Sequence, residues 1–144
     1  MPAQCTRLPG CRVRVLIVDD EPTTRLLLRA MVVGAGCESV EVGDAVEALD
    51  ALRSGQRFDV IFCDIMMPRM TGREFRTRVG LWLPGQAERV VLMTGNPALE
   101  HSARLVYGNC LPKPLSKQAV IQAIETAAGP ISAPSATRAS EPRA

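Results

Sequence analysis

The sequence predicts an α/β protein in which a parallel sheet of five strands carries helices on both faces. Short apolar runs, typical of buried parallel strands, alternate along the chain with longer segments of helical spacing. Right-handed crossovers between parallel strands place helices on both faces, which makes the sheet doubly wound.

The first two strands and helices lie in the N-terminal part of the chain. Strands are expected at 13–18 and 39–42, and Pro22 stands where the first residue of a helix is expected. Asp44 and Glu47 have the spacing of a capping box before the second helix. The two helices are expected to bury Leu27, Ala30, Met31 and Gly34, and Ala45, Ala48, Leu49 and Leu52.

The remaining helices follow three further strands. Thr71 and Glu74 form a capping box before the third helix, residues 97–106 show a weaker helical pattern, and Ser116 can cap the last helix. Trp82 is placed in a loop, where we expect it to cover the edge of the core rather than to form a contact patch. The further strands are predicted at 59–63, 89–93 and 109–111.

Composition limits the classes of function. The chain has 144 residues, a length that suits one domain. Its net charge of +2 gives no reason to expect a nucleic-acid or membrane partner. No apolar run approaches the roughly 18 residues that span a bilayer. Five scattered cysteines without a C-x-x-C pair indicate reduced thiols and a cytoplasmic location.

The chain divides into three parts. We expect a flexible arm at 1–11, a folded domain at 12–128 and a disordered tail at 129–144, which is rich in Pro, Ser and Ala. Such a tail is too short for a DNA-binding unit, so the expected partners are an unidentified downstream protein and a second copy of this chain.

Polar residues stand at four of the predicted strand ends. Asp19 and Asp20 follow the first strand, Asp64 the third, Thr94 the fourth and Lys113 the fifth. Ligands bind at this edge of open parallel sheets. Three carboxylates repel one another unless a cation neutralises them, and Mg²⁺ does so with one or two direct carboxylate ligands. Lys113 and Thr94 suit an adjacent phosphoryl group.

These residues lie in segments that resemble receiver domains of bacterial two-component response regulators, of the chemotaxis Y protein type. The resemblance spans roughly residues 12 to 127, and its last two segments look especially like receivers that work with hybrid histidine kinases. The matching segments are VLIVDDEP at 15–22, DIMMPRMTG at 64–72, MTG at 93–95 and LPKP at 111–114.

The resemblance implies a flavodoxin-like fold with strand order 2-1-3-4-5. It implies that Asp64 accepts a phosphoryl group from the phosphohistidine of a histidine kinase, hybrid kinase or phosphotransfer protein. The chain would then change the face that binds a partner protein, or pass the group on as a phosphorelay intermediate. Lys113 and Thr94 would bind that group, and the Lys113–Pro114 peptide bond would be cis. The implied Mg²⁺ ligands are Asp19, Asp20, Asp64 and the backbone carbonyl of Met66.

The chain departs from the family pattern at two places. Family members usually carry Tyr or Phe three residues before the lysine, where this chain has Cys110, and Tyr107 is not expected to substitute for that ring. The interval from Thr94 to Lys113 is a few residues shorter than in the family, so we expect a trimmed or irregular fourth helix. Both departures put in doubt the coupling, usual in the family, between Thr94 and the aromatic ring that Cys110 replaces.

Two other functions compete with the phosphoacceptor hypothesis. A phosphorylation-independent adaptor would use the same fold as a docking surface, which Cys110 favours mildly. An aspartyl-phosphate phosphatase would need a second acid two residues after Asp64, where Met66 stands. We therefore expect the chain to catalyse only its own phosphorylation and dephosphorylation, and not to act as an enzyme on other substrates.

Several residues have a simpler interpretation as structural residues. His101 is expected at the surface, Cys63 in the core, and the Met66–Met67 pair in loop packing. No zinc site or histidine-based catalysis is therefore expected.

Overall fold

The computed structural model describes residues 12–129 of the chain. The predicted arm at 1–11, and all of the predicted tail except its first residue, lie outside the described residues. The strands are β1 (Arg14–Val18), β2 (Glu38–Val42), β3 (Val60–Asp64), β4 (Val90–Thr94) and β5 (Cys110–Pro112). The helices are α1 (Pro22–Gly34), α2 (Ala45–Arg53), α3 (Gly72–Trp82), α4 (Pro84–Ala87), α5 (Pro97–Tyr107) and α6 (Lys117–Ala128).

The five strands form one parallel sheet in the order β2-β1-β3-β4-β5, which confirms the predicted topology. β3 and β4 are buried along their whole length, as expected for central strands between two helical layers. Both begin and end one residue later than predicted, so Asp64 and Thr94 are the last residues of their strands.

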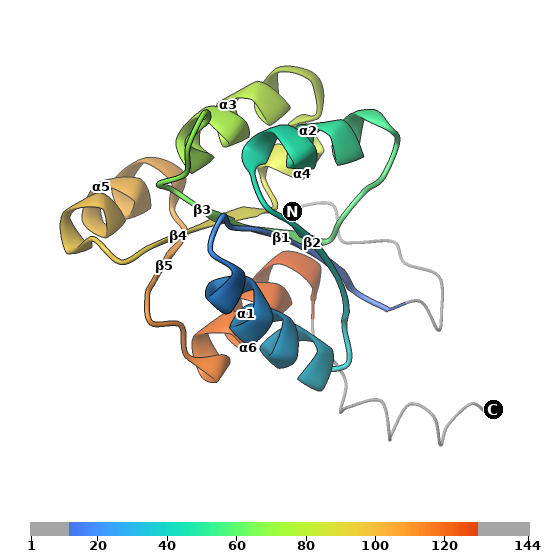
Figure 1. The fold of residues 1–144 in the computed structure, drawn as a ribbon, viewed down its shortest axis with the longest axis vertical. Coiled ribbons are helices and arrows are strands. Elements are labelled where there is room, and N and C mark those ends of the chain that lie inside the picture. Colours follow the sequence, from blue (N-terminus) through green and yellow to red (C-terminus); the bar gives the residue numbers. More distant parts are fainter. Residues whose placement is uncertain (1–11, 130–144) are drawn as a thin grey trace.

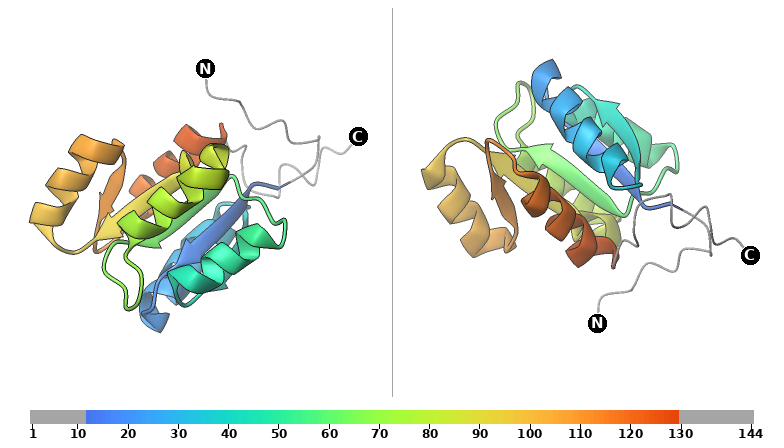
Figure 2. Two further views of the ribbon diagram at one scale, coloured as in Figure 1. Left: turned by 90° about the horizontal axis from the view of Figure 1, so that it is seen from above. Right: turned by 90° about the horizontal axis from the view of Figure 1, so that it is seen from below.

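Helices cover both faces of the sheet (Figure 1 and Figure 2). α1 and α6 lie on one face, and α2 to α5 lie on the other. Successive strand residues point to opposite faces, so Leu16 and Val18 belong to one apolar cluster and Val15 and Ile17 to the other. Two cores therefore hold the strand ends in fixed positions.

Short side-chain motifs set the starts of two helices. The Thr71 hydroxyl accepts a hydrogen bond from the Glu74 N–H at 3.1 Å, and the Glu74 carboxylate accepts one from the Thr71 N–H at 2.9 Å. This completes the predicted capping box of α3. Asp44 caps α2 as well, but the Glu47 carboxylate accepts from the N–H of Gly43 instead of Asp44, so the second box is incomplete.

Helix α1 begins at Pro22 as predicted but buries a different stripe. Leu28 and Val32 are fully buried, whereas Leu27 is 46% exposed and Ala30 is exposed as well. Leucines occupy three successive positions at 26–28, so spacing alone favours no one of them, and packing against the sheet and α6 selects Leu28. The predicted stripe of α2 is buried in full.

The segment around Trp82 is helical, which corrects the prediction of a loop. Trp82 is the last residue of α3, and α4 follows immediately. Trp82 is 40% exposed and its ring lies 5.6 Å from the guanidinium of Arg53, while Leu83 packs against the core. Leu83, not Trp82, therefore covers the edge of the core.

Helix α5 corresponds to the segment for which a trimmed or irregular helix was expected. It is continuous over 11 residues, is capped by Asn96, and is followed by Gly108 with φ 79°, a conformation that favours glycine. The expectation of irregularity is therefore wrong. Within residues 12–129, no helix has the length and apolar character needed to cross a membrane.

Candidate functional site

The carboxyl ends of four strands meet at one edge of the sheet. Asp19 directly follows β1, Asp64 ends β3, Thr94 ends β4 and Lys113 directly follows β5. The strand order places β3 between β1 and β4, so residues as far apart in sequence as Asp19 and Lys113 come into contact. The sequence analysis predicted this meeting point.

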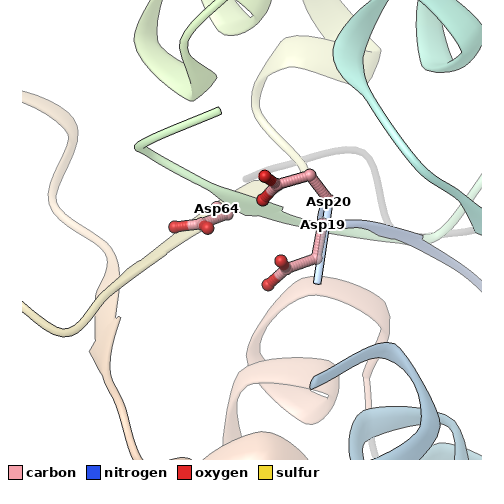
Figure 3. A group of neighbouring side chains, drawn as sticks. All are labelled: Asp19, Asp20 and Asp64. Carbon is pink, nitrogen blue, oxygen red and sulfur yellow. The ribbon is translucent and has the colours of Figure 1, made fainter. Parts of the chain in front are cut away.

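Three carboxylates form the centre of the site (Figure 3). One oxygen from each of Asp19, Asp20 and Asp64 lies within 4.8 Å of the others, and the side chains point into a shared space. Asp19 is fully buried and Asp64 is 8% exposed, whereas Asp20 is exposed. The cluster therefore combines buried negative charge with access to solvent.

Lys113 contacts two members of this cluster. Its Nζ donates to Asp19 Oδ2 at 2.9 Å and to Asp64 Oδ2 at 3.3 Å. Its backbone N–H donates to the Thr94 carbonyl at 2.8 Å, and the Lys113–Pro114 peptide bond is cis, as the resemblance implied. One lysine facing three carboxylates leaves an excess of negative charge when all three are ionised.

The charges at the site shift two pKa values. Burial, and then the negative charge of Asp19, raise the pKa of Asp64, while Lys113 opposes this rise. Burial alone would lower the pKa of Lys113, but the hydrogen bond to Asp19 and the charge of Asp64 outweigh burial and raise it. Lys113 is therefore held in its charged form, and Asp64 lacks full compensation.

This donor set fits Mg²⁺. The ion prefers oxygen ligands and keeps several of its waters, so it needs only one or two direct carboxylates and a route to solvent. Asp19, Asp20 and Asp64 supply the carboxylates, and the exposure of Asp20 leaves room for waters. The Met66 N–H lies 3.4 Å from Asp64 Oδ1, and the role of the Met66 carbonyl stays a prediction.

A glycine at the start of α3 supports the backbone of Asp64. The Gly72 N–H donates to the Ile65 carbonyl at 2.9 Å, and a Cβ on Gly72 would lie 2.4 Å from the Asp64 carbonyl oxygen. No side chain fits at that distance, so only glycine allows α3 to approach Asp64 so closely. The sequence analysis missed this role of Gly72. The only indication in the sequence was that a glycine directly follows the Thr71 cap.

Two contacts from α1 and the loop before it hold Asp19. The Glu21 N–H donates to Asp19 Oδ1 at 2.9 Å, and Arg25 donates to the Asp19 carbonyl at 2.6 Å. Sequence reasoning did not identify Arg25, because nothing in the sequence distinguishes it from the other arginines of the chain.

Thr94 is buried and connects the site to α5. Its Oγ1 accepts a hydrogen bond from the Asn96 N–H at 3.1 Å. Asn96 in turn caps α5, because its side chain accepts from the Ala98 N–H at 2.9 Å. The hydroxyl therefore anchors the beginning of this helix.

The departures from the family pattern lie on β5 and α5. Cys110 is fully buried in β5, and Tyr107 lies at the end of α5 with its ring 4.8 Å from the guanidinium of Arg76. Tyr107 therefore contacts α3, as expected of a ring that does not take the place of the missing aromatic residue.

The residues expected to be structural behave as follows. His101 is exposed, and Cys63 is fully buried, where burial and then the charge of Asp64 raise the pKa of its thiol well above the ordinary value. Met67 is buried, but Met66 is 61% exposed, so only one of the two methionines packs in the loop.

Comparison with known proteins gives one consistent result. Residues 15–125 match the family of response regulator receiver domains. The sensor histidine kinase RcsC of Salmonella typhi is 33% identical over 116 residues, which cover 76% of this chain and 12% of the kinase. The sensor histidine kinase GacS of Pseudomonas protegens is 31% identical over 120 residues, which cover 77% of this chain and 13% of that kinase.

Solved structures show the same fold. The chemotaxis protein CheY4 of Vibrio cholerae superposes with a TM-score of 0.69 at 26% identity, covering 81% of this chain and 99% of that chain. A sensor protein from Polaromonas sp. JS666, at 24% identity, has a TM-score of 0.70 and covers 81% of this chain and 96% of its own. The chain belongs to the response regulator receiver domain family.

Proposed function

We propose that this receiver accepts a phosphoryl group on Asp64 from a histidine kinase, a hybrid kinase or a phosphotransfer protein, with Mg²⁺ held by Asp19, Asp20 and Asp64. One observation carries the proposal. Lys113 reaches Asp19 and Asp64 at 2.9 and 3.3 Å beside a cluster of three carboxylates that it cannot neutralise alone.

The chemistry follows from these positions. An oxygen of Asp64 forms a bond to phosphorus while the bond between phosphorus and the donor imidazole nitrogen breaks, and the bonding pair stays on the imidazole. Lys113 neutralises a phosphoryl oxygen, and the Thr94 hydroxyl donates a hydrogen bond to another. Mg²⁺, when bound, offsets the repulsion between the carboxylates and the incoming phosphoryl group.

The relatives support the choice of phosphoryl donor. Two of them are named sensor histidine kinases, although the chain spans only 12% and 13% of their lengths. We further propose that the protein works in the cytoplasm, where the buried thiols of Cys37, Cys63 and Cys110 stay reduced. Phosphorylation then changes the face that binds an unidentified downstream protein or a second copy of this chain, or the chain passes the phosphoryl group on as a phosphorelay intermediate.

Phosphoryl uptake tests the proposal directly. Incubation with Mg²⁺ and acetyl phosphate should label the parent chain, and the label should be lost in hydroxylamine, which cleaves acyl phosphates. Asp64→Ala should abolish labelling, whereas Asp50→Ala, at an exposed position of α2, should not change it. EDTA should prevent labelling in every case.

The outcomes separate the competing functions. Retained labelling in the Asp64→Ala variant would show that another residue is the acceptor. Absence of labelling in the parent, together with no binding of beryllofluoride, would favour the phosphorylation-independent adaptor that the buried Cys110 favours mildly.

A further inference from the structure

Two non-covalent side-chain contacts connect α3 to α5. The Nη2 of Arg73 donates to the Ser102 hydroxyl at 2.8 Å, and the Arg76 guanidinium lies 4.8 Å from the centre of the Tyr107 ring. Both arginines belong to α3, and both partners belong to α5. We call these four residues the α3–α5 clamp.

The two arginine side chains of the clamp are partly buried. The Nε atoms of Arg73 and Arg76 are buried and form no hydrogen bond within the part of the chain that the structure describes. An arginine at the surface would keep these atoms in water. The two cations are therefore held in place by Ser102 and Tyr107.

Apart from the clamp, α5 is held by few buried side chains. Ala103 is its only fully buried residue, Leu99 and Tyr107 pack partly buried against the core, and Leu105 and Val106 are 74% and 70% exposed. Elements with little buried apolar surface open and shift most easily. The polar contacts of the clamp therefore add to a small apolar contact surface of α5.

Both helices begin at the candidate site. Gly72, the first residue of α3, lies against the carbonyl of Asp64, and the next residue is Arg73. The cap of α5, Asn96, donates its N–H to the Thr94 hydroxyl. A change at Asp64 or Thr94 therefore acts directly on the start of each helix.

Strand β5 offers no aromatic ring that could transmit such a change. Cys110 is fully buried, and its small side chain cannot swing between a buried and an exposed position as a ring can.

We propose that the clamp couples the phosphorylation of Asp64 to α5. This inference rests on the proposed function, in which the Thr94 hydroxyl donates to the phosphoryl group; a hydroxyl that turns to do so weakens its hydrogen bond from the Asn96 N–H. The start of α5 is thereby released. The contacts of the clamp hold α5 in the position that it occupies before phosphorylation. Arg73, Arg76, Ser102 and Tyr107 are positioning residues and do not contact the phosphoryl group.

Hydrogen exchange of residues 97–107 tests the inference, measured with Mg²⁺ before and after the addition of beryllofluoride. Fluorine NMR of the bound beryllofluoride measures occupation of Asp64 separately. The main variant combines Ser102→Ala with Arg76→Met, and Tyr107→Leu removes the ring alone. Tyr107→Phe keeps the ring, and Arg78→Met removes an exposed arginine of α3 that is not part of the clamp.

In the parent chain, beryllofluoride should make hydrogen exchange in α5 about tenfold faster, because the start of the helix is released. In the double variant, exchange should already be about tenfold faster with Mg²⁺ alone, because a hydrogen bond and a cation–π contact are lost. Beryllofluoride should then have less than about a twofold further effect, while binding as well as in the parent. Tyr107→Leu should show part of this loss, and Tyr107→Phe and Arg78→Met should match the parent.

Two results overturn the inference while leaving the proposed function intact. In one, beryllofluoride changes the exchange rate of α5 in the double variant and in Tyr107→Leu as much as it does in the parent. The other is a parent that binds beryllofluoride without any change in α5. If the parent does not bind beryllofluoride, the proposed function itself is wrong, and the coupling falls with it.

Discussion

The two ends of the strands both bury polar side chains, but the partners of these side chains differ. At the amino ends, Gln86 of α4 accepts from the Phe58 N–H at 3.0 Å and donates to the Phe58 carbonyl at 3.1 Å. Asp59 is buried nearby, and its Oδ2 accepts from the Arg14 N–H at 2.8 Å. At the carboxyl ends, three carboxylates face one lysine.

The difference separates structural from functional polar groups. A buried polar group with a complete set of partners fixes the fold and leaves nothing for a ligand to satisfy. Carboxylates without sufficient positive charge destabilise the folded chain, and a cation or a substrate can relieve that cost. Partner number, not burial alone, therefore identifies the candidate site.

The largest effect is expected at the amino ends of the strands. Gln86→Leu should lower the free energy of unfolding by about 2–5 kcal/mol, because it leaves the buried N–H and carbonyl of Phe58 without their side-chain partner. Urea unfolding measures this loss. Labelling of Asp64 in the folded fraction should be unchanged, and the exposed Gln118→Leu should stay within about 0.5 kcal/mol of the parent.

Mg²⁺ should produce the next largest effect, with the opposite sign. At 100 times its dissociation constant, the ion should raise the free energy of unfolding by about 2.7 kcal/mol, since it binds the folded chain alone. Urea unfolding with MgCl₂ or EDTA measures the difference. Asp64→Asn should reduce it, whereas Asp59→Asn should not. An equal response in both variants would place the ion elsewhere.

A smaller loss is expected at Asp59. Asp59→Ala should lower the free energy of unfolding by about 1–3 kcal/mol, because the Arg14 N–H loses its acceptor. Asp59→Asn keeps an amide oxygen that can accept the same hydrogen bond, so its loss should be smaller. Thermal or urea unfolding of the two variants at neutral pH compares them. Equal losses would show that the hydrogen bond itself contributes little.

The smallest effect is expected for Asp64→Asn without metal, because Lys113 partly offsets the burial and the charge of Asp19. The pKa of Asp64 is higher in the folded chain than its ordinary value of 3.8, so the folded chain binds this proton more tightly. Its contribution to stability therefore falls as the pH rises from 3.8 through the folded-state pKa. Asp64→Asn removes this penalty and should be more stable than the parent above that pKa.

Urea unfolding in EDTA over a series of pH values measures this gain. The difference between Asp64→Asn and the parent should shrink as the pH falls and level off below 3.8, where the carboxyl group becomes protonated in both the folded and the unfolded chain. A gain that stays constant with pH would contradict the electrostatic explanation.

Sequence reasoning located the candidate site because its residues directly follow the strands. Asp19, Asp64, Thr94 and Lys113 stand at or next to strand ends, and the ends of parallel strands meet whatever the details of helix packing. The same reasoning chose the wrong stripe for α1 and missed α4. Three leucines in a row satisfy helical spacing equally well, and a helix of four residues has no period to detect.

The order of apolar runs and the residues that end them determined the sheet, its topology class and the carboxylates beside a lysine, because these features depend on local pattern and chain connectivity. Only the tertiary structure decided that Gly72 must approach Asp64, that Gln86 pairs with Phe58, and that Arg73 and Arg76 reach α5. Such contacts depend on the distance between elements that are far apart in the sequence. That distance follows from how the two cores pack on the sheet, which no local pattern specifies.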